Sequence, residues 1–91
     1  MDTRTIKVLL FGPARDAVGG KAEISVKIDG DTTNIAGLRG IISQTFPEMR
    51  HILESSIFAV NNRMIPKPKE TSECIVPGKA EIVLVPPVSG G

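Results

Sequence analysis

Apolar and polar residues alternate near both ends of the chain, which predicts β-strands. The first predicted strand, residues 5–11, is apolar on two faces, one made by Ile6, Val8 and Leu10 and the other by Leu9 and Phe11. Residues 23–28 alternate more strictly, with inward-facing Ile24, Val26 and Ile28. We therefore expect the second strand to be half exposed and to pair with the first as a hairpin. The first strand is expected near the centre of a sheet.

A helical period follows the turn at residues 29–31. Asn34 is a suitable N-cap, and Pro47 is expected to end the helix. The apolar residues between them fall on one stripe, made by Ile35, Leu38, Ile41, Ile42 and Phe46. Gly37 and Gly40 each lower the stability of such a helix by about 1 kcal/mol relative to Ala. Packing of the stripe against a sheet must therefore stabilise it.

Two further strands are predicted at residues 57–60 and 80–85, and the first of them ends at the turn-forming pair Asn61-Asn62. Residues 66–73, between them, are polar. We expect a solvated loop there, in which the charges balance: Lys67, Lys69, Glu70 and Glu73.

The element order β-β-α-β-β indicates an α+β fold, with a mixed sheet of four to five strands and one main helix packed on one face. In each central strand only alternate side chains can reach that helix. Phe11, Val83 and Val85 are therefore expected on the opposite face of the sheet, where an exposed apolar patch would mark a protein interface.

Composition excludes several classes of function. The chain has 91 residues, enough for one small domain, and a net charge of +1, which offers no basic stripe for phosphates. Three Phe without Trp or Tyr provide no stacking platform, so nucleic-acid binding is not expected. Near the N-terminus only residues 8–11 form a continuous apolar run, too short for a signal peptide or a membrane span. With a single Cys as well, we expect a cytoplasmic protein without disulfides or membrane contact.

No set of side chains suggests a catalytic or metal site. His51 is the only histidine and is interpreted as a surface residue near a helix end, and one His with one Cys cannot make a zinc site. Cys74 has no neighbouring base or cation in the sequence, which favours a small, partly buried packing residue over a nucleophile. Lys79 is interpreted as an ordinary exposed charge. We expect no bound cofactor.

The last residues offer a chemistry of the backbone instead. Val85 leads into Pro86 and Pro87, which favour extended backbone, and the sequence continues as Val88, Ser89, Gly90 and Gly91. Glycine lacks a Cβ, so a diglycine end can pass through a narrow channel. Fully extended, residues 87–91 would reach roughly 17 Å, enough to enter a partner's active site. We expect residues 1–86 to form the domain and residues 87–91 to form a flexible tail.

The sequence resembles the small subunits of molybdopterin synthase, a branch of the ubiquitin-like sulfur carriers. Four segments carry the resemblance, at residues 6–15, 34–39, 58–61 and 85–91, and the last is the most specific. The sequence departs from the family at two places. The turn at residues 77–81 often reads Gly-Asp-Glu in the family, and Ala36 stands where an acidic residue is usual. The resemblance implies a β-grasp (ubiquitin-like) fold.

The resemblance also implies a mechanism carried by Gly91. An E1-like adenylyltransferase would use ATP to adenylate the Gly91 carboxylate, and sulfur would then replace AMP to give a thiocarboxylate. The tail, kept thin by Gly90, would enter the large subunit of molybdopterin synthase within a heterotetramer. There it would donate sulfur to cyclic pyranopterin monophosphate and so form the dithiolene of molybdopterin. Arg15 stands where the family also has arginine. The expected partner interface comprises Phe11, Arg15, Val83, Val85, Pro86, Pro87, Val88 and Ser89.

Two other functions stay open from the sequence. The same activated Gly91 could be joined to a target lysine, which would make the chain a protein modifier. Alternatively, the chain could carry sulfur for thiazole or tRNA thiolation. Carriers of that second kind share the diglycine but have the Pro86-Pro87 pair less often, so the molybdopterin function ranks first.

Overall fold

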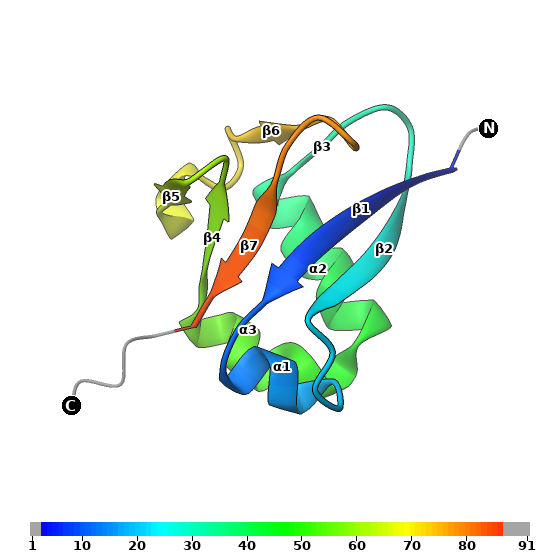
Figure 1. Cartoon of the computed structure of the whole chain (residues 1–91). Helices are drawn as coiled ribbons and strands as arrows, with labels where there is room; N and C mark the ends of the chain where they lie inside the picture. Colours follow the sequence, from blue (N-terminus) through cyan, green and yellow to red (C-terminus); the bar gives the residue numbers. More distant parts are fainter. Residues whose placement is uncertain (1–2, 87–91) are drawn as a thin grey trace.

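The computed structural model describes residues 3–86 (Figure 1). The strands and helices follow one another as β1 (Thr3–Leu10), α1 (Pro13–Ala17), β2 (Glu23–Asp29), β3 (Thr33–Asn34), α2 (Ile35–Thr45), α3 (Arg50–Ser55), β4 (Ile57–Val60), β5 (Arg63–Ile65), β6 (Cys74–Ile75) and β7 (Ile82–Val85). Two 3-10 turns, η1 (Pro47–Met49) and η2 (Lys67–Lys69), follow α2 and β5.

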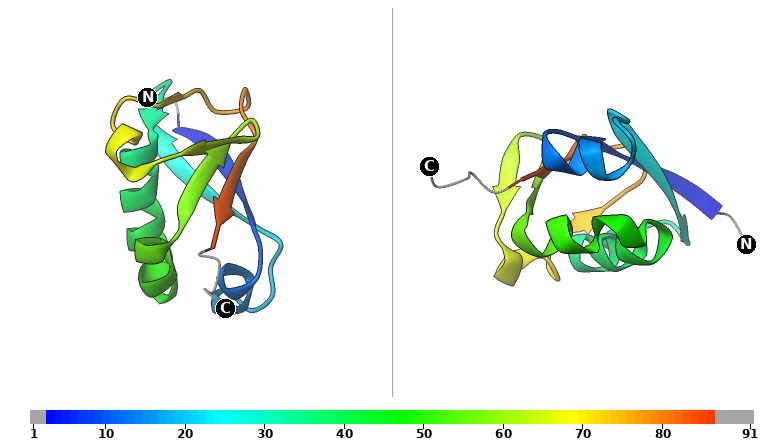
Figure 2. Two further views of the ribbon diagram at one scale, coloured as in Figure 1. Left: turned by 90° about the vertical axis from the view of Figure 1, so that its left-hand side faces the viewer. Right: turned by 90° about the horizontal axis from the view of Figure 1, so that it is seen from below.

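Five strands form one mixed sheet in the order β2-β1-β7-β4-β5. β1 and β2 form the expected antiparallel hairpin, whereas β1 runs parallel to β7. β7, in the middle of the sheet, is antiparallel to β4. Helices α2 and α3 pack on one face of this sheet (Figure 2), which confirms the predicted layer arrangement. A second, two-stranded sheet joins β3 to β6.

Asn34 caps α2 as the sequence predicts. Its side-chain oxygen accepts a hydrogen bond of 2.7 Å from the amide of Gly37. The two preceding amides of the helix donate to the backbone carbonyls of Glu70 and Glu73, so the first turn of α2 leaves none of these three donors unpaired. Fully buried apolar residues of the predicted stripe are Ile35, Leu38 and Ile42.

The core lies between the sheet and α2. The residues predicted to face inward from the first two strands are all buried, at most 3% exposed: Ile6, Val8, Leu10, Ile24, Val26 and Ile28. Residues of β7 follow the same alternation, because Ile82 and Leu84 are buried while Val83 and Val85 are only half-buried. The strand faces were thus assigned correctly from the sequence.

The two glycines of α2 have different surroundings, which gives a test of the helix packing. A Cβ on Gly40 would meet no atom within 4 Å, whereas a Cβ on Gly37 would lie 2.7 Å from Oγ1 of Thr33. We expect Gly40→Ala to raise the free energy of unfolding by about 0.5 to 1 kcal/mol, because it adds no clash and restricts the unfolded chain. Gly37→Ala, the matched control, should bring no gain. Urea denaturation measures both, and a Gly40→Ala variant no more stable than Gly37→Ala would contradict this packing.

Several short elements were not predicted: α3, β5 and the β3–β6 pair. Each is shorter than the stretch over which a hydrophobic period can be recognised, which is about 11 residues for a helix and about four for a strand. The last strand also begins at Ile82 rather than at residue 80. The amide and carbonyl of Glu81 are bonded instead to Asn61, at 2.9 Å each.

The interpretation of Cys74 as a partly buried residue was wrong. Cys74 is exposed, because successive side chains of a strand point to opposite sides and its neighbour Ile75 occupies the core. His51 is exposed on α3, as expected. No helix within residues 3–86 has the length and apolar character needed to cross a membrane.

Candidate functional site

The root of the predicted tail leaves the sheet at the end of its middle strand. That strand, β7, has a neighbour on each side. Its last pair with β1 is Leu84 with Leu10, and its last pair with β4 is Val85 with Ile57. Pro86 follows directly. The remaining tail positions predicted from the sequence lie outside the described residues: Pro87, Val88, Ser89, Gly90 and Gly91.

The turn after β1 borders the root of the tail. Gly12 has φ 55° and ψ −130°, a conformation that residues with a Cβ rarely adopt. A Cβ built on Gly12 would lie 3.7 Å from Cγ of Pro86. Gly12 and Pro13 thus turn the chain from β1 into α1 immediately beside Pro86.

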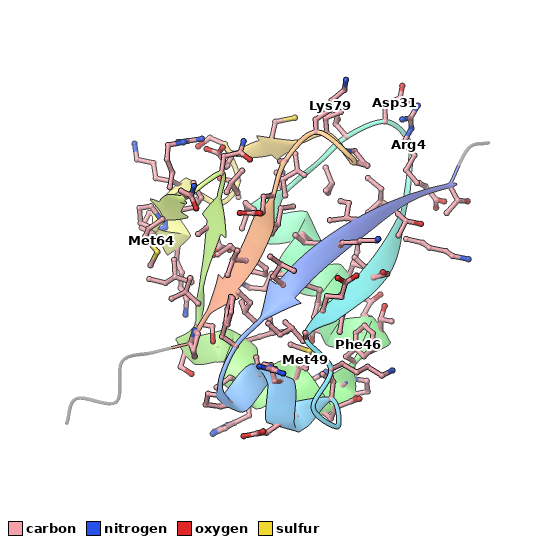
Figure 3. All side chains as sticks on the ribbon, in the orientation of Figure 1. Arg4, Asp31, Phe46, Met49, Met64 and Lys79 are labelled. Atoms are coloured by element: carbon pink, nitrogen blue, oxygen red, sulfur yellow. The ribbon has the colours of Figure 1, made fainter. Side chains whose placement is uncertain are left out.

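The sheet face away from α2 carries a row of apolar side chains. Strand pairing places Leu9 beside Val83, Val83 beside Ala59, and Ala59 beside Met64. Met64, at the outer strand β5, is 55% exposed (Figure 3). We call this surface the apolar face and define it by Leu9, Phe11, Ile57, Ala59, Met64, Val83 and Val85.

The predicted interface residues that the structure describes gather at the tail end of the apolar face. Phe11 is 52% exposed and lies between the end of β1 and the Gly12 turn. The parallel pairing of β1 with β7 ends at Leu10 and Leu84, and the next residue on each side is Phe11 and Val85. Val85 therefore lies beside Phe11, and it is half-buried. Arg15 is exposed on α1, which lies at the same end of the sheet (Figure 1). Contact of these residues with a partner stays a prediction.

Side chains within residues 3–86 form no group of three His, Cys, Asp or Glu that could hold a metal ion. The exposed thiol of Cys74 belongs to β6, at the end of the molecule opposite the tail root (Figure 1). Cys74 therefore does not lie near Pro86.

An ion pair between α2 and the segment after η2 was missed by the sequence interpretation. Nε and Nη2 of Arg39 lie 3.0 and 2.5 Å from the two carboxylate oxygens of Glu70. Their side chains are only 20% and 6% exposed. The expectation of a solvated loop at residues 66–73 is therefore wrong at Glu70. This residue comes directly after the 3-10 turn η2, and its buried side chain contacts Arg39 of α2.

The same guanidinium ties the helices to the start of β4. Arg39 donates to the backbone carbonyls of Leu53 and Ser56, the latter at 3.0 Å. Its Cζ also lies 5.1 Å from the centre of the Phe58 ring. Ser56 directly precedes Ile57, the residue of β4 that pairs with Val85. The bonds from Arg39 therefore stabilise the start of β4, which in turn holds Val85, the last strand residue before the tail.

Comparisons with known proteins agree with this arrangement. The ThiS family profile matches residues 8–91. The molybdopterin synthase sulfur carrier subunit of Dictyostelium discoideum is 29% identical over 85 residues, which cover 93% of this chain and 94% of that protein.

Two solved structures have the same fold. The solution structure of small archaeal modifier protein 1 from Methanosarcina acetivorans has a TM-score of 0.70 at 21% identity and covers 100% of both chains. A chain in the protein–protein complex of subunits 1 and 2 of molybdopterin-converting factor from Helicobacter pylori has a TM-score of 0.59 at 23% identity, covering 96% of this chain and 99% of that one. These likenesses and the strand order confirm the predicted β-grasp (ubiquitin-like) fold.

Proposed function

The chain belongs to the ThiS family, and on that premise we propose that it is the sulfur carrier subunit of a molybdopterin synthase. Its relative from Dictyostelium discoideum carries that name. The observation that carries the proposal is the exposed end of the apolar face around Pro86, at the root of the diglycine tail. A surface of this kind suits a partner that receives the tail.

The proposed chemistry begins at the Gly91 carboxylate. A carboxylate is a poor acyl donor because its leaving group would be oxide. In the proposal, an E1-like adenylyltransferase uses ATP to convert it into an acyl-adenylate, with pyrophosphate released. A sulfur donor then displaces AMP and leaves a thiocarboxylate on Gly91.

The chain then delivers this sulfur to the large subunit. The thiocarboxylate is anionic at neutral pH, and its soft sulfur attacks cyclic pyranopterin monophosphate. Each carrier holds one sulfur while a dithiolene needs two, so two loaded copies are used for each molybdopterin. Acid, base and substrate-binding groups are assigned to the large subunit.

The geometry of residues 3–86 supports this use of the tail. Val85 is fixed in the sheet by Ile57, and Pro86 is placed against Gly12, so the direction in which the chain leaves the sheet is set by strand pairing. Beyond this root, Gly90 leaves the tip thin enough to thread.

We assign the apolar face to the large subunit, with Arg15 at its margin. We expect Phe11→Asp to weaken binding of the large subunit by about 2 kcal/mol or more if Phe11 is a central anchor. Thermal melting should change little, because the Phe11 side chain is half exposed. Val76→Asp is the control, since Val76 is 38% exposed near the other end of the sheet, and it should bind normally. In calorimetry and melting of both variants, unchanged binding with a collapsed melting temperature for Phe11→Asp would make Phe11 a core residue.

Intact mass spectrometry separates the carrier from the protein modifier. After incubation with the activating enzyme, ATP and a sulfur donor, a carrier gains the mass of one sulfur-for-oxygen exchange at Gly91. A modifier instead gives isopeptide adducts on lysines, and adducts without a thiocarboxylate would overturn the proposal. A carrier for thiazole or tRNA thiolation also gains this mass, but it would not lose its sulfur to the large subunit and the pterin precursor.

A further inference from the structure

The outer edge of β2 is a free strand edge. β2 is an end strand of the five-stranded sheet and pairs with β1 on one side (Figure 1). It has seven residues, whereas β5, at the opposite edge of the sheet, has three. A long unpaired edge is a template for another strand, and proteins commonly keep such edges short. β2 is therefore the edge of this sheet that can accept an added strand over the greater length.

Backbone groups of alternate β2 residues point outward from this edge. The amide of Leu10 donates to the carbonyl of Ala22, so Ala22 directs its backbone groups toward β1. This direction alternates along an antiparallel strand, so the backbone groups of Ser25 and Lys27 point away from β1. Within residues 3–86 no strand or turn forms hydrogen bonds with these outward groups. They are free to bond to a further antiparallel strand.

The side chains along this edge carry charges in a self-complementary order. From residue 21 to residue 29 every second residue is exposed, and these residues are Lys21, Glu23, Ser25, Lys27 and Asp29. Consider the strand antiparallel to a second copy of itself, with Ser25 opposite Ser25. Glu23 then lies opposite Lys27, and Lys21 lies opposite Asp29. The two-fold axis generates each pair twice, so all the charges on this edge meet the opposite charge across the two strands.

The charges also distinguish this register from its neighbours. A shift of two residues in either direction still sets outward backbone groups opposite one another. One shift sets Glu23 opposite Asp29, and the other sets Lys21 opposite Lys27. Like charges directly opposite each other destabilise a strand pair. The register centred on Ser25 is therefore favoured over both.

These charges are little used within the chain. Lys21, Lys27 and Asp29 have no ion-pair partner among the described residues. The carboxylate of Glu23 is 3.9 Å from Nζ of Lys7, and the Glu23 side chain is 48% exposed. An exposed pair of this kind contributes little and leaves the carboxylate accessible to a second cation. The charges of the β2 edge can therefore pair with those of another copy.

We propose that two copies of this chain associate through their β2 edges, with Ser25 at the two-fold axis, so that the two sheets become one continuous sheet. The outward backbone groups of Ser25 bond to Ser25 of the second copy, and those of Glu23 bond to Lys27 of the second copy. The Glu23–Lys27 ion pairs fix the register. Because β1 separates this edge from β7, the association uses neither Pro86 nor the tail and does not depend on sulfur transfer.

Two charge reversals test the register. Glu23→Lys sets lysine opposite lysine, and Lys27→Glu sets glutamate opposite glutamate, so each variant should associate with itself about tenfold more weakly than the parent chain. An equimolar mixture of the two variants restores opposite charges in both pairs and should associate like the parent. Sedimentation velocity of the full-length chains measures this, and circular dichroism confirms that each variant is folded. A parent chain that stays monomeric at millimolar concentration, or a mixture that associates no better than its components, would overturn the proposal.

A matched control and solution NMR locate the interface. Lys69→Glu makes the same charge change on η2, which follows the strand at the opposite edge of the sheet, and should associate like the parent. In the ¹⁵N-labelled parent chain, the amides of Ser25 and Lys27 should shift with protein concentration and exchange more slowly with solvent. Equal weakening by Lys69→Glu and Lys27→Glu, or concentration-dependent shifts centred on the apolar face, would show that the copies do not meet through β2.

Discussion

Removal of Gly91 is expected to abolish sulfur transfer and to leave the melting temperature of the domain unchanged. The activated atom in the proposal is the terminal carboxyl carbon, and without Gly91 it lies about 3.3 to 3.6 Å nearer the fold. A reacting group misplaced by even 1 Å can lose about a hundredfold in rate. Stability should not change, because the core is built from residues of the described domain.

Adding one residue after Gly91 should have the same effect, since it removes the glycine carboxylate from the end of the chain. Cys74→Ser is the control and should carry and transfer sulfur normally, because β6 lies far from the tail root (Figure 1). Transfer by an extended chain whose extension is shown to remain uncleaved would refute the assignment to Gly91. A folded Cys74→Ser variant unable to accept sulfur would make the thiol a participant.

Glu70→Gln is expected to lower the free energy of unfolding by about 3 kcal/mol, a large share of the total for a small domain. The substitution keeps the shape of the side chain but leaves the charge of Arg39 unpaired, with only a fifth of that side chain exposed. Arg39 would keep its bonds to the carbonyls of Leu53 and Ser56, so we place the loss at the lower end of the range for breaking a buried pair. Urea denaturation measures it.

The matched control is Glu73→Gln, which breaks the pair between Glu73 and Arg63 at 2.9 Å, where the arginine side chain is 65% exposed. Its loss should stay below about 1 kcal/mol because solvent screens the pair. The double variant Arg39→Met with Glu70→Leu should regain only part of the loss, since it leaves no buried charge unpaired but removes the donor to the carbonyls of Leu53 and Ser56. Equal destabilisation by Glu70→Gln and Glu73→Gln would show that the Arg39 cluster does not stabilise the fold.

Periodicity was sufficient to predict the strand faces and the main helix. Ile6 and Ile82 are buried where alternation places them, and Phe11 is exposed where alternation leaves it without cover. The Asn34 cap was predictable because its chemistry is local. The tail chemistry was likewise suggested by residue types at adjacent positions, since glycine and proline affect the backbone directly.

Long-range features escaped the sequence interpretation because no period encodes them. Arg39 and Glu70 are 31 residues apart, and nothing near either residue indicates the other. The start of β7 at Ile82 follows the bonds between Glu81 and Asn61, which are 20 residues apart. These features follow from strand register and turn geometry in three dimensions.

The sulfur-carrier proposal is tested most directly by one single-turnover measurement. The thiocarboxylated chain is mixed with the large subunit of molybdopterin synthase and cyclic pyranopterin monophosphate, and the forms of Gly91 are counted by intact mass against the molybdopterin formed. The proposal predicts that two loaded chains return to the carboxylate for each molybdopterin made. A loaded chain that keeps its sulfur in the presence of both, or molybdopterin formed equally well from the unloaded carboxylate, would contradict it.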